Sequence, residues 1–312
     1  MRKAAYAALM GLVLLSVFPS GSNLTLTAWG QTGPGGGGSA GATWTVRVSD
    51  IMLNAVAYGN GFFVAVGKGG TILTSRDGII WKVRDSGTAN DLSGVTCGNG
   101  LFVAVGDSFF TPTSTILTSR DGVAWRVRTS GTSKGLYDVT YGGGLFVAVG
   151  DGGTVLTSRD GASWTKRTSG TGNDLLGVAY GNGLFVAVGK GGTILTSRDG
   201  VTWTRRTSGT DGWFEEVAYG GGLFVVVGKG GTILTSRDGA SWTKRTSGTS
   251  SWLFGVAYGG GLFVAVNGGT ILTSPDGITW TKRTSGTDNH LSAVTYGNGT
   301  FVAVGGAILT FP

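Results

Sequence analysis

The chain has 312 residues, of which 61 are glycine, while 40% are hydrophobic and only 13% are charged. Glycine makes up roughly a fifth of the chain, well above its usual share, but the abundance of apolar residues excludes a disordered low-complexity sequence. Only five prolines are present, which excludes collagen and polyproline structures. The composition therefore predicts a packed fold with many tight turns.

The N-terminus is typical of a secretory signal peptide. Arg2 and Lys3 precede an uncharged and mostly apolar run over residues 4–18, which is short for a membrane-spanning helix. We therefore predict a signal peptide over residues 1–22. Retention of this segment as a membrane anchor is the alternative interpretation.

Small residues around position 22 suit cleavage before Asn23, and Gly30 marks a second possible cleavage site. Residues 23–43 are rich in glycine and are predicted to form a flexible linker. The rest of the chain, residues 44–312, is predicted to be one domain. The expected location is extracytoplasmic, secreted or periplasmic in a bacterium, with no membrane span after cleavage.

A repeat with a period near 39 residues runs through this domain. One unit, residues 175–207, has the pattern of four short strands in a meander, with a Gly-Asn-Gly hairpin turn at 181–183. Its second strand, residues 184–188, is apolar without alternation, which predicts burial on both faces, as in a blade packed between two others. The period follows from the tryptophans at 44, 81, 125, 164, 203, 242 and 280.

The number of repeats predicts the architecture. The second-strand motif occurs seven times, and its last copy is followed by one further strand and then the end of the sequence. The missing outer strand is matched by residues 44–48, which have no preceding blade of their own. The sequence therefore predicts an all-β, seven-bladed β-propeller of four-stranded antiparallel blades, in which residues 44–48 complete the blade formed by residues 291–310.

A second motif, Ser-Arg-Asp-Gly-x-x-Trp, recurs at residues 75–81, 119–125, 158–164, 197–203 and 236–242, with a proline variant at 274–280. It resembles the Asp-box, or bacterial neuraminidase repeat, with one residue fewer between Asp and Gly. The chain is thus similar to the Asp-box propellers, which include sialidases, sortilin-type receptors and the photosystem II assembly factors. The resemblance implies a propeller with its boxes on the periphery, opposite the binding face.

The box residues themselves favour a structural role. An aspartate before glycine lets the carboxylate accept backbone N–H bonds within the turn, while the tryptophan packs between blades. One aspartate in each turn does not supply the several oxygens that a calcium site needs. No metal site and no cofactor are expected.

The net charge of +7 is unevenly distributed. The boxes and outer strands carry 18 basic and six acidic residues, whereas the connections of the other face carry four lysines and eleven acids. Lys and Arg on outer strands protect exposed edges from pairing, and binding of an anionic surface polymer is the functional alternative. Nucleic-acid binding is not expected, because the sequence offers no reading helix or basic aromatic groove.

Enzymatic activity is not expected. A sialidase needs an arginine cluster on its ligand face, and every arginine of the propeller lies in a box or an outer strand. The alternative function is a glycoside hydrolase that uses Asp138 with Glu215 or Glu216, two blades away.

Two lone residues are assigned structural roles: His290 as an exposed loop residue and Cys97 as a buried apolar filler in a position that other repeats give to tyrosine.

The segments that enter the first strand of each repeat differ most, and they lie on one face. An apolar position within them, occupied by Leu53 in the first repeat and Leu136 in the third, is predicted to be core. Its neighbours place aromatic and acidic side chains around the mouth of the propeller, which suits a protein segment, a cationic group or a sugar ring.

The function predicted is a monomeric, non-enzymatic module that binds an unknown protein or carbohydrate. The alternative interpretation is that the loop sequences have diverged without a binding role and that Trp213 and Trp252 only cap the core. The candidate ligand-binding residues are Tyr137, Asp138, Trp213, Glu215, Glu216, Trp252, Phe254 and His290, with Phe109 and Phe110 from an insertion in the second blade.

Overall fold

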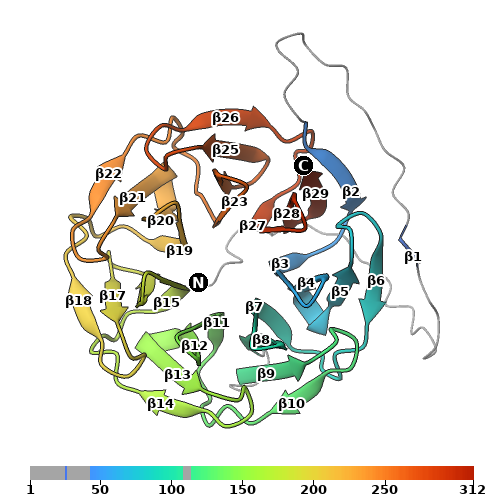
Figure 1. Cartoon of the computed structure of the whole chain (residues 1–312), viewed down its shortest axis with the longest axis horizontal. Helices are drawn as coiled ribbons and strands as arrows, with labels where there is room; N and C mark the ends of the chain where they lie inside the picture. The colour runs from blue at the N-terminus through green and yellow to red at the C-terminus, as the bar shows by residue number, and fades with distance from the viewer. Residues whose placement is uncertain (1–24, 27–42, 108–113) are drawn as a thin grey trace, which may run out of the picture.

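The computed structural model describes residues 25–26, 43–107 and 114–312. Seven antiparallel sheets are arranged in a ring around a central axis (Figure 1), which confirms the predicted seven-bladed β-propeller. The signal peptide predicted over residues 1–22 lies outside the described residues, as do Phe109 and Phe110.

Each blade runs from an inner strand at the axis to an outer strand at the circumference. The inner strands are β3 (Leu53–Gly59), β7 (Asp91–Gly98), β11 (Leu136–Gly142), β15 (Leu175–Gly181), β19 (Phe214–Gly220), β23 (Gly255–Gly259) and β27 (Leu291–Gly297). The second strands are β4 (Phe62–Gly67), β8 (Leu101–Asp107), β12 (Leu145–Gly150), β16 (Leu184–Gly189), β20 (Leu223–Gly228), β24 (Leu262–Val266) and β28 (Thr300–Gly305). The third strands are β5 (Ile72–Ser75), β9 (Ser114–Ser119), β13 (Thr154–Ser158), β17 (Ile194–Ser197), β21 (Thr232–Ser236), β25 (Thr270–Ser274) and β29 (Ala307–Phe311). The outer strands are β6 (Trp81–Arg84), β10 (Arg126–Arg128), β14 (Thr165–Arg167), β18 (Thr204–Arg206), β22 (Thr243–Arg245), β26 (Thr281–Thr284) and β2 (Thr45–Ser49).

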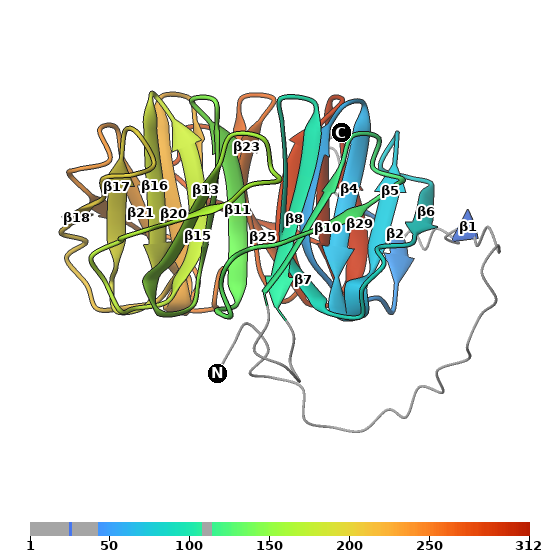
Figure 2. The same cartoon turned by 90° about the horizontal axis from the view of Figure 1, so that it is seen from below.

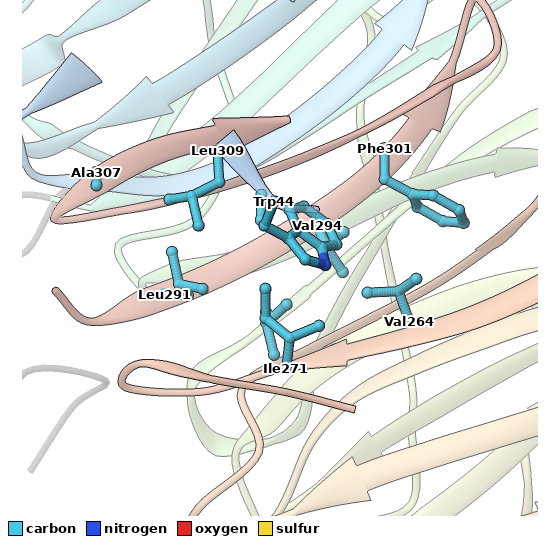
Figure 3. Packing of buried hydrophobic residues seen from close by; sticks show 10 residues of the cluster. Trp44, Val264, Ile271, Leu291, Val294, Phe301, Ala307 and Leu309 are labelled. Atoms are coloured by element: carbon cyan, nitrogen blue, oxygen red, sulfur yellow. The ribbon is translucent and has the colours of Figure 1, made fainter. Parts of the chain in front are cut away.

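The ring is closed by a strand from the N-terminal side of the domain. Strand β2 pairs antiparallel with β29, with Thr45 opposite Thr310, so the seventh blade has the order β2-β29-β28-β27. Trp44, just before β2, packs among Leu309, Val264 and other side chains of the last two blades (Figure 3). This pairing confirms the predicted closure by residues 44–48. Within the segment predicted as a linker, β1 (Thr25–Leu26) pairs with β6 as a fifth strand of the first blade.

The hydrophobic core lies between blades. Its seven clusters each join side chains of two adjacent blades; one of them places Phe63 and Trp81 of the first blade against Val302 and Val304 of the seventh. The second strands are buried along almost their whole length, as predicted from their lack of alternation. Apolar packing between neighbouring blades therefore stabilises the ring as one unit.

The box turns have the bonds predicted for them. In the third blade the Asp160 carboxylate accepts hydrogen bonds from the Ala162 and Ser163 amides, both at 2.8 Å, and from the Ser158 hydroxyl at 3.0 Å. Trp164 donates its indole N–H to the Gly161 carbonyl at 2.9 Å. The two amide bonds lower the pKa of Asp160 to about 2. The other five boxes repeat the contacts of the aspartate and the tryptophan.

Two sets of connections collect on opposite faces of the ring, since the strands run between those faces (Figure 2). On one face the hairpin after an inner strand meets the box turn of the next blade, as shown by the 3.1 Å bond from the Asn60 amide to the Arg120 carbonyl. On the other face the connection after a second strand meets the segment that enters the inner strand, as shown by the 3.1 Å bond from the Lys68 amide to the Met52 carbonyl. We call this second face the loop face. It contains the short 3₁₀ turns η1 (Lys68–Gly70), η2 (Asp151–Gly153) and η3 (Lys229–Gly231).

Near the opposite face, six of the seven inner strands pack a tyrosine ring on the glycine of the preceding blade. A Cβ added to Gly98 would lie 2.0 Å from Cγ of Tyr141, so only glycine fits there. Cys97 occupies the tyrosine position in the second blade and packs on Gly59; it is half-buried, like the tyrosines of the other blades, rather than buried as predicted, because this position lies at the edge of the core. Burial nevertheless raises the pKa of the Cys97 thiol to about 11.

Candidate functional site

Six of the seven inner strands begin with a β-bulge on the loop face; β23 is the exception. In the third blade the register shifts between Leu136 and Asp138, and in the fifth between Phe214 and Glu216. The apolar residue before each bulge is buried, as predicted for the core position. An extra residue in a strand changes the direction of its neighbours, and three of the bulged side chains, Tyr137, Leu176 and Glu215, are buried. The bulged residues are Asn54, Ser93, Tyr137, Leu176, Glu215 and Ser292.

Four of the predicted ligand-binding residues form a continuous row across blades five to seven. Trp213 and Trp252 contact edge to face with ring centroids 5.7 Å apart, and Trp252 stacks on Phe254 at 5.6 Å. Phe254 contacts the ring of His290 at 4.5 Å. We call these four residues the aromatic row. The three larger rings are half-buried and His290 is exposed, so the row presents apolar surface on the loop face.

Two lysines approach the indole rings of the aromatic row. Lys190 Nζ lies 4.8 Å from the Trp213 ring centre and also makes a 2.7 Å ion pair with Asp174. Lys229 Nζ lies 5.5 Å from the centre of Trp213 and 5.6 Å from that of Trp252. Lys229 is exposed, and within the described residues no carboxylate lies within ion-pair distance of it. An ammonium group is therefore held beside the row and remains accessible to an anion.

Two of the predicted ligand-binding residues are buried and support their neighbours. Glu215 is 2% exposed and accepts a hydrogen bond from the Trp252 indole at 3.1 Å. Tyr137 is 6% exposed and donates its hydroxyl to Asp151, which also accepts a bond from the Gly135 amide. Burial, followed by the bond to Asp151, raises the pKa of the Tyr137 hydroxyl. Neither side chain presents a surface to a ligand in this arrangement.

Asp138 and Glu216 line the central channel, which has a volume of about 300 Å³. Asp138 accepts a hydrogen bond from the Val178 amide of the next blade at 2.8 Å, and Glu216 accepts one from the amide of Val217 at 2.9 Å. The remaining wall consists mainly of small apolar side chains and threonines from all seven inner strands, with Tyr58 and Cys97. The two carboxylates thus give the channel a negative lining. No residue of the aromatic row lines this channel.

Lys190, Lys229, Asp151 and Asp174 belong to the charges of the loop face, but they were not predicted as parts of a site. A signal was available for three of them, because Asp151, Lys190 and Lys229 each follow the second strand of their repeat, whereas Asp174 directly precedes an inner strand. His290 is exposed as a residue, as expected, but partial burial of its ring lowers its pKa. In the described part of the chain, no group of three His, Cys, Asp or Glu side chains could hold a metal ion. No helix in that part is long and apolar enough to cross a membrane.

Comparisons with known proteins agree with this architecture. A family model described as the DUF6242 beta propeller domain matches residues 85–214. The chain is a β-propeller. No curated protein sequence matches it.

Several solved structures share the fold at low sequence identity. A structure titled "YCF48 bound to D1 peptide" aligns with a TM-score of 0.70 and 15% identity over 88% of this chain and 95% of the other. YCF48 from Cyanidioschyzon merolae gives 0.68 and 17%, covering 86% and 99% of the two chains. The WD40 propeller domain of Doa1 gives 0.67 and 14%, covering 87% and 97%. At these identities the similarity establishes the fold.

Proposed function

We propose that the chain is an exported, non-enzymatic interaction module that binds an extended segment of another protein along the aromatic row. The observation that carries this proposal is the continuous contact from Trp213 through Trp252 and Phe254 to His290. Partly buried aromatic rings beside a polar rim are typical of the central residues of protein interfaces. The row spans three blades, a length that suits an extended segment better than a small molecule.

The charges around the row indicate the chemistry of that segment. Lys229 lies beside Trp213 and Trp252 and is exposed, so it can pair with a carboxylate. Lys190 is already paired with Asp174 and is less available. We therefore expect a partner segment with an apolar or aromatic side chain that packs on the row and an acidic group next to it that reaches Lys229.

The structural neighbours support this proposal at the level of the fold. One of them is a YCF48 structure that contains a D1 peptide, and another is a WD40 propeller domain. The resemblance of the box motif to the Asp-box propellers, which include photosystem II assembly factors, points in the same direction. A role in the assembly of a protein complex is one specialisation of such a module.

The proposal is tested by selection from a random peptide library displayed on phage, with the purified protein immobilised. We expect the selected peptides to combine an aromatic or aliphatic residue with Asp or Glu, and their binding to fall at least about tenfold in Trp213→Ala and in Lys229→Ala, a loss of about 1.4 kcal/mol or more. Lys68→Ala is the matched control, because Lys68 begins η1 as Lys229 begins η3. Selected peptides that bind all three variants equally well would overturn the proposal.

A glycan ligand and glycoside hydrolysis are the competing functions. The observation that favours hydrolysis is the presence of Asp138 and Glu216 in one channel. However, Asp138 accepts a hydrogen bond from the backbone of the adjacent blade, which gives its carboxylate a structural use. A glycan array together with a panel of chromogenic glycosides tests both functions. If the protein hydrolyses a glycoside and the Asp138→Asn and Glu216→Gln variants do not, glycoside hydrolysis would replace binding as the proposed function.

A further inference from the structure

The turns η1, η2 and η3 of the loop face have the same backbone conformation. Their middle glycines, Gly69, Gly152 and Gly230, have φ angles of 60°, 58° and 67° and ψ angles of 29°, 34° and 29°. A Cβ added to the last glycine of each turn would lie 1.9–2.1 Å from a threonine carbonyl oxygen of the next blade, at Thr88, Thr171 and Thr249 respectively. The three junctions between blades are therefore built alike, and their corresponding residues can be compared directly.

In two of these junctions the amide of the middle glycine binds a carboxylate of the next blade. Gly69 donates its amide to Asp91 Oδ1 at 2.8 Å, and Gly152 donates its amide to Asp174 Oδ1 at 2.8 Å. The second oxygen of Asp174 accepts a 2.7 Å bond from the Lys190 ammonium group. Although partial burial raises the pKa of Asp174, the bonds from Gly152 and Lys190 lower it below its ordinary value. A turn amide together with an ammonium group therefore stabilises a charged carboxylate on this face.

The third junction has the donors but a different residue in the place of the aspartate. Each of the two aspartates lies three residues after the threonine of its junction, and three residues after Thr249 the chain has Trp252. Its indole donates to Glu215, and in the described part of the chain no acceptor is bonded to the amide of Gly230. Gly230 is exposed, as is Lys229 directly before it, whose Nζ lies 5.6 Å from the centre of the Trp252 ring. An amide and an ammonium group are thus available where two other junctions hold a carboxylate.

We propose that η3 is a binding site for a carboxylate of the partner, with Gly230 donating its amide and Lys229 its ammonium group. The inference rests on the proposed function, because this carboxylate belongs to the segment that packs on the aromatic row. One oxygen accepts the amide bond and the other pairs with the ammonium group, as at Asp174. The rings of Trp213 and Trp252 favour a carboxylate next to an apolar or aromatic side chain. An Asp or Glu side chain and the C-terminus of a chain both offer this group.

The first experiment follows backbone amides by proton–nitrogen NMR during titration with N-acetyltryptophan or N-acetyltryptophanamide, which lacks the carboxylate. We expect the acid to move the Gly230 signal downfield and the amide to leave it nearly unchanged, while both move the indole signals of Trp213 and Trp252. Gly69 and Gly152 are internal controls, since their amides already bind carboxylates and should not respond.

The two proposals fail separately in this titration. No response of Gly230 to the acid at about 10 mM, ten times a dissociation constant of about 1 mM, or an equal response to both probes, would overturn the carboxylate site. If the indole signals of Trp213 and Trp252 still move, the aromatic row remains a binding surface. If only Gly230 responds, the carboxylate site remains and binding along the row is wrong.

Two further probes distinguish the sources of the carboxylate. Acetyl-Trp-Asp-amide offers only a side-chain carboxylate, and acetyl-Trp-Asn-amide is its neutral counterpart, whereas the carboxylate of N-acetyltryptophan is that of a C-terminus. We expect at least one acid to bind about threefold or more tightly than its neutral counterpart, and that acid identifies the source. If neither acid does so, the proposal is wrong.

Variants of Trp252 provide an independent test, because Trp252→Asp supplies the carboxylate that the other two junctions have. This variant should move the Gly230 signal downfield without any probe and abolish its response to the acid. Trp252→Ala removes the same ring without supplying a carboxylate, so it should keep a weaker response. Lys229→Ala should weaken binding of the acid by about threefold to tenfold and leave binding of the neutral probe unchanged. Identical behaviour of the two Trp252 variants would contradict the proposed site.

Discussion

Trp44 and Phe311, from opposite ends of the propeller sequence, stack with their ring centroids 5.2 Å apart and their planes at 20°. Phe311 also contacts Phe301 of the neighbouring strand at 6.3 Å. The closure of the ring thus depends on hydrogen bonds between β2 and β29 and on an aromatic contact next to them. A ring closed between the two ends of the chain couples the stability of every blade to this one junction.

Replacing Trp44 by alanine is expected to lower the free energy of unfolding by about 3–5 kcal/mol, because the indole is 7% exposed and packed between the last two blades. Urea unfolding followed by circular dichroism measures the loss. Trp203→Ala, which removes a box tryptophan from the middle of the ring, is the control. Both variants should be less stable, but only Trp44→Ala should accelerate hydrogen exchange in β2 and β29. An unchanged urea midpoint in Trp44→Ala would show that residues 44–48 do not close the ring.

The box aspartates give stability that depends on pH. Backbone amides of Ser163 and Ala162 hold the pKa of Asp160 at about 2, below its ordinary value of 3.8. A depressed pKa in the folded state stabilises the fold above 3.8, and this contribution is lost as the pH falls through that value towards about 2. The stability difference between the unmodified chain and Asp160→Ala should therefore be constant from about pH 5 to 7 and shrink below about pH 4.

Urea midpoints of the two proteins, measured side by side across this range, test the prediction. Comparison with the variant removes the contribution of the other acids. Asp160→Asn is a useful control, since its side-chain oxygen still accepts the amide bonds and its stability difference should be smaller. A difference that grows on acidification would contradict the assigned role of the carboxylate.

Cys97→Tyr is expected to restore the ring that six other blades have at this position. In those blades the tyrosine contacts the phenylalanine of the second strand at 4.6–4.7 Å, and the equivalent phenylalanine beside Cys97 is Phe102. The variant should be more stable by about 0.5–1.5 kcal/mol in urea unfolding. Cys97→Ala, which only removes the sulfur, should not be stabilised. A destabilised tyrosine variant would mean that the second blade has adapted around the cysteine.

The blade count could be predicted from the repeat period, which the spacing of tryptophans such as Trp81 and Trp125 gives. The closure could be predicted because the strand after Trp44 matches an outer strand but has no preceding blade of its own. The directions of the loop-face side chains could not. Glu215 lies two positions after Trp213, yet the bulge turns it into the interior while the indole stays partly exposed. The contact of Lys229 with two indoles joins connections of two successive blades, and sequence spacing within one repeat gives no information about it.

The basic outer strands contain two kinds of cation, and neighbouring arginines in the fourth blade distinguish them. Arg206 donates its Nε–H to the Thr196 hydroxyl at 2.8 Å, whereas Arg205 is exposed. We expect Arg206→Ala to lower the free energy of unfolding by about 1 kcal/mol, since a hydrogen bond within the blade is lost, and Arg205→Ala to change it by less than about 0.5 kcal/mol. Each of the other blades repeats the arginine–threonine bond.

The same pair of variants tests the binding of anionic polymers by the outer strands. If the exposed cations bind such a polymer, Arg205→Ala should reduce the salt concentration needed to elute the protein from heparin resin more than Arg206→Ala does. Retention of the unmodified chain above about 0.5 M salt would support polymer binding, because simple edge charges are largely screened there. Weak retention with no difference between the variants would leave edge protection as the role of these cations, since protection requires only that an incoming strand meets a charge.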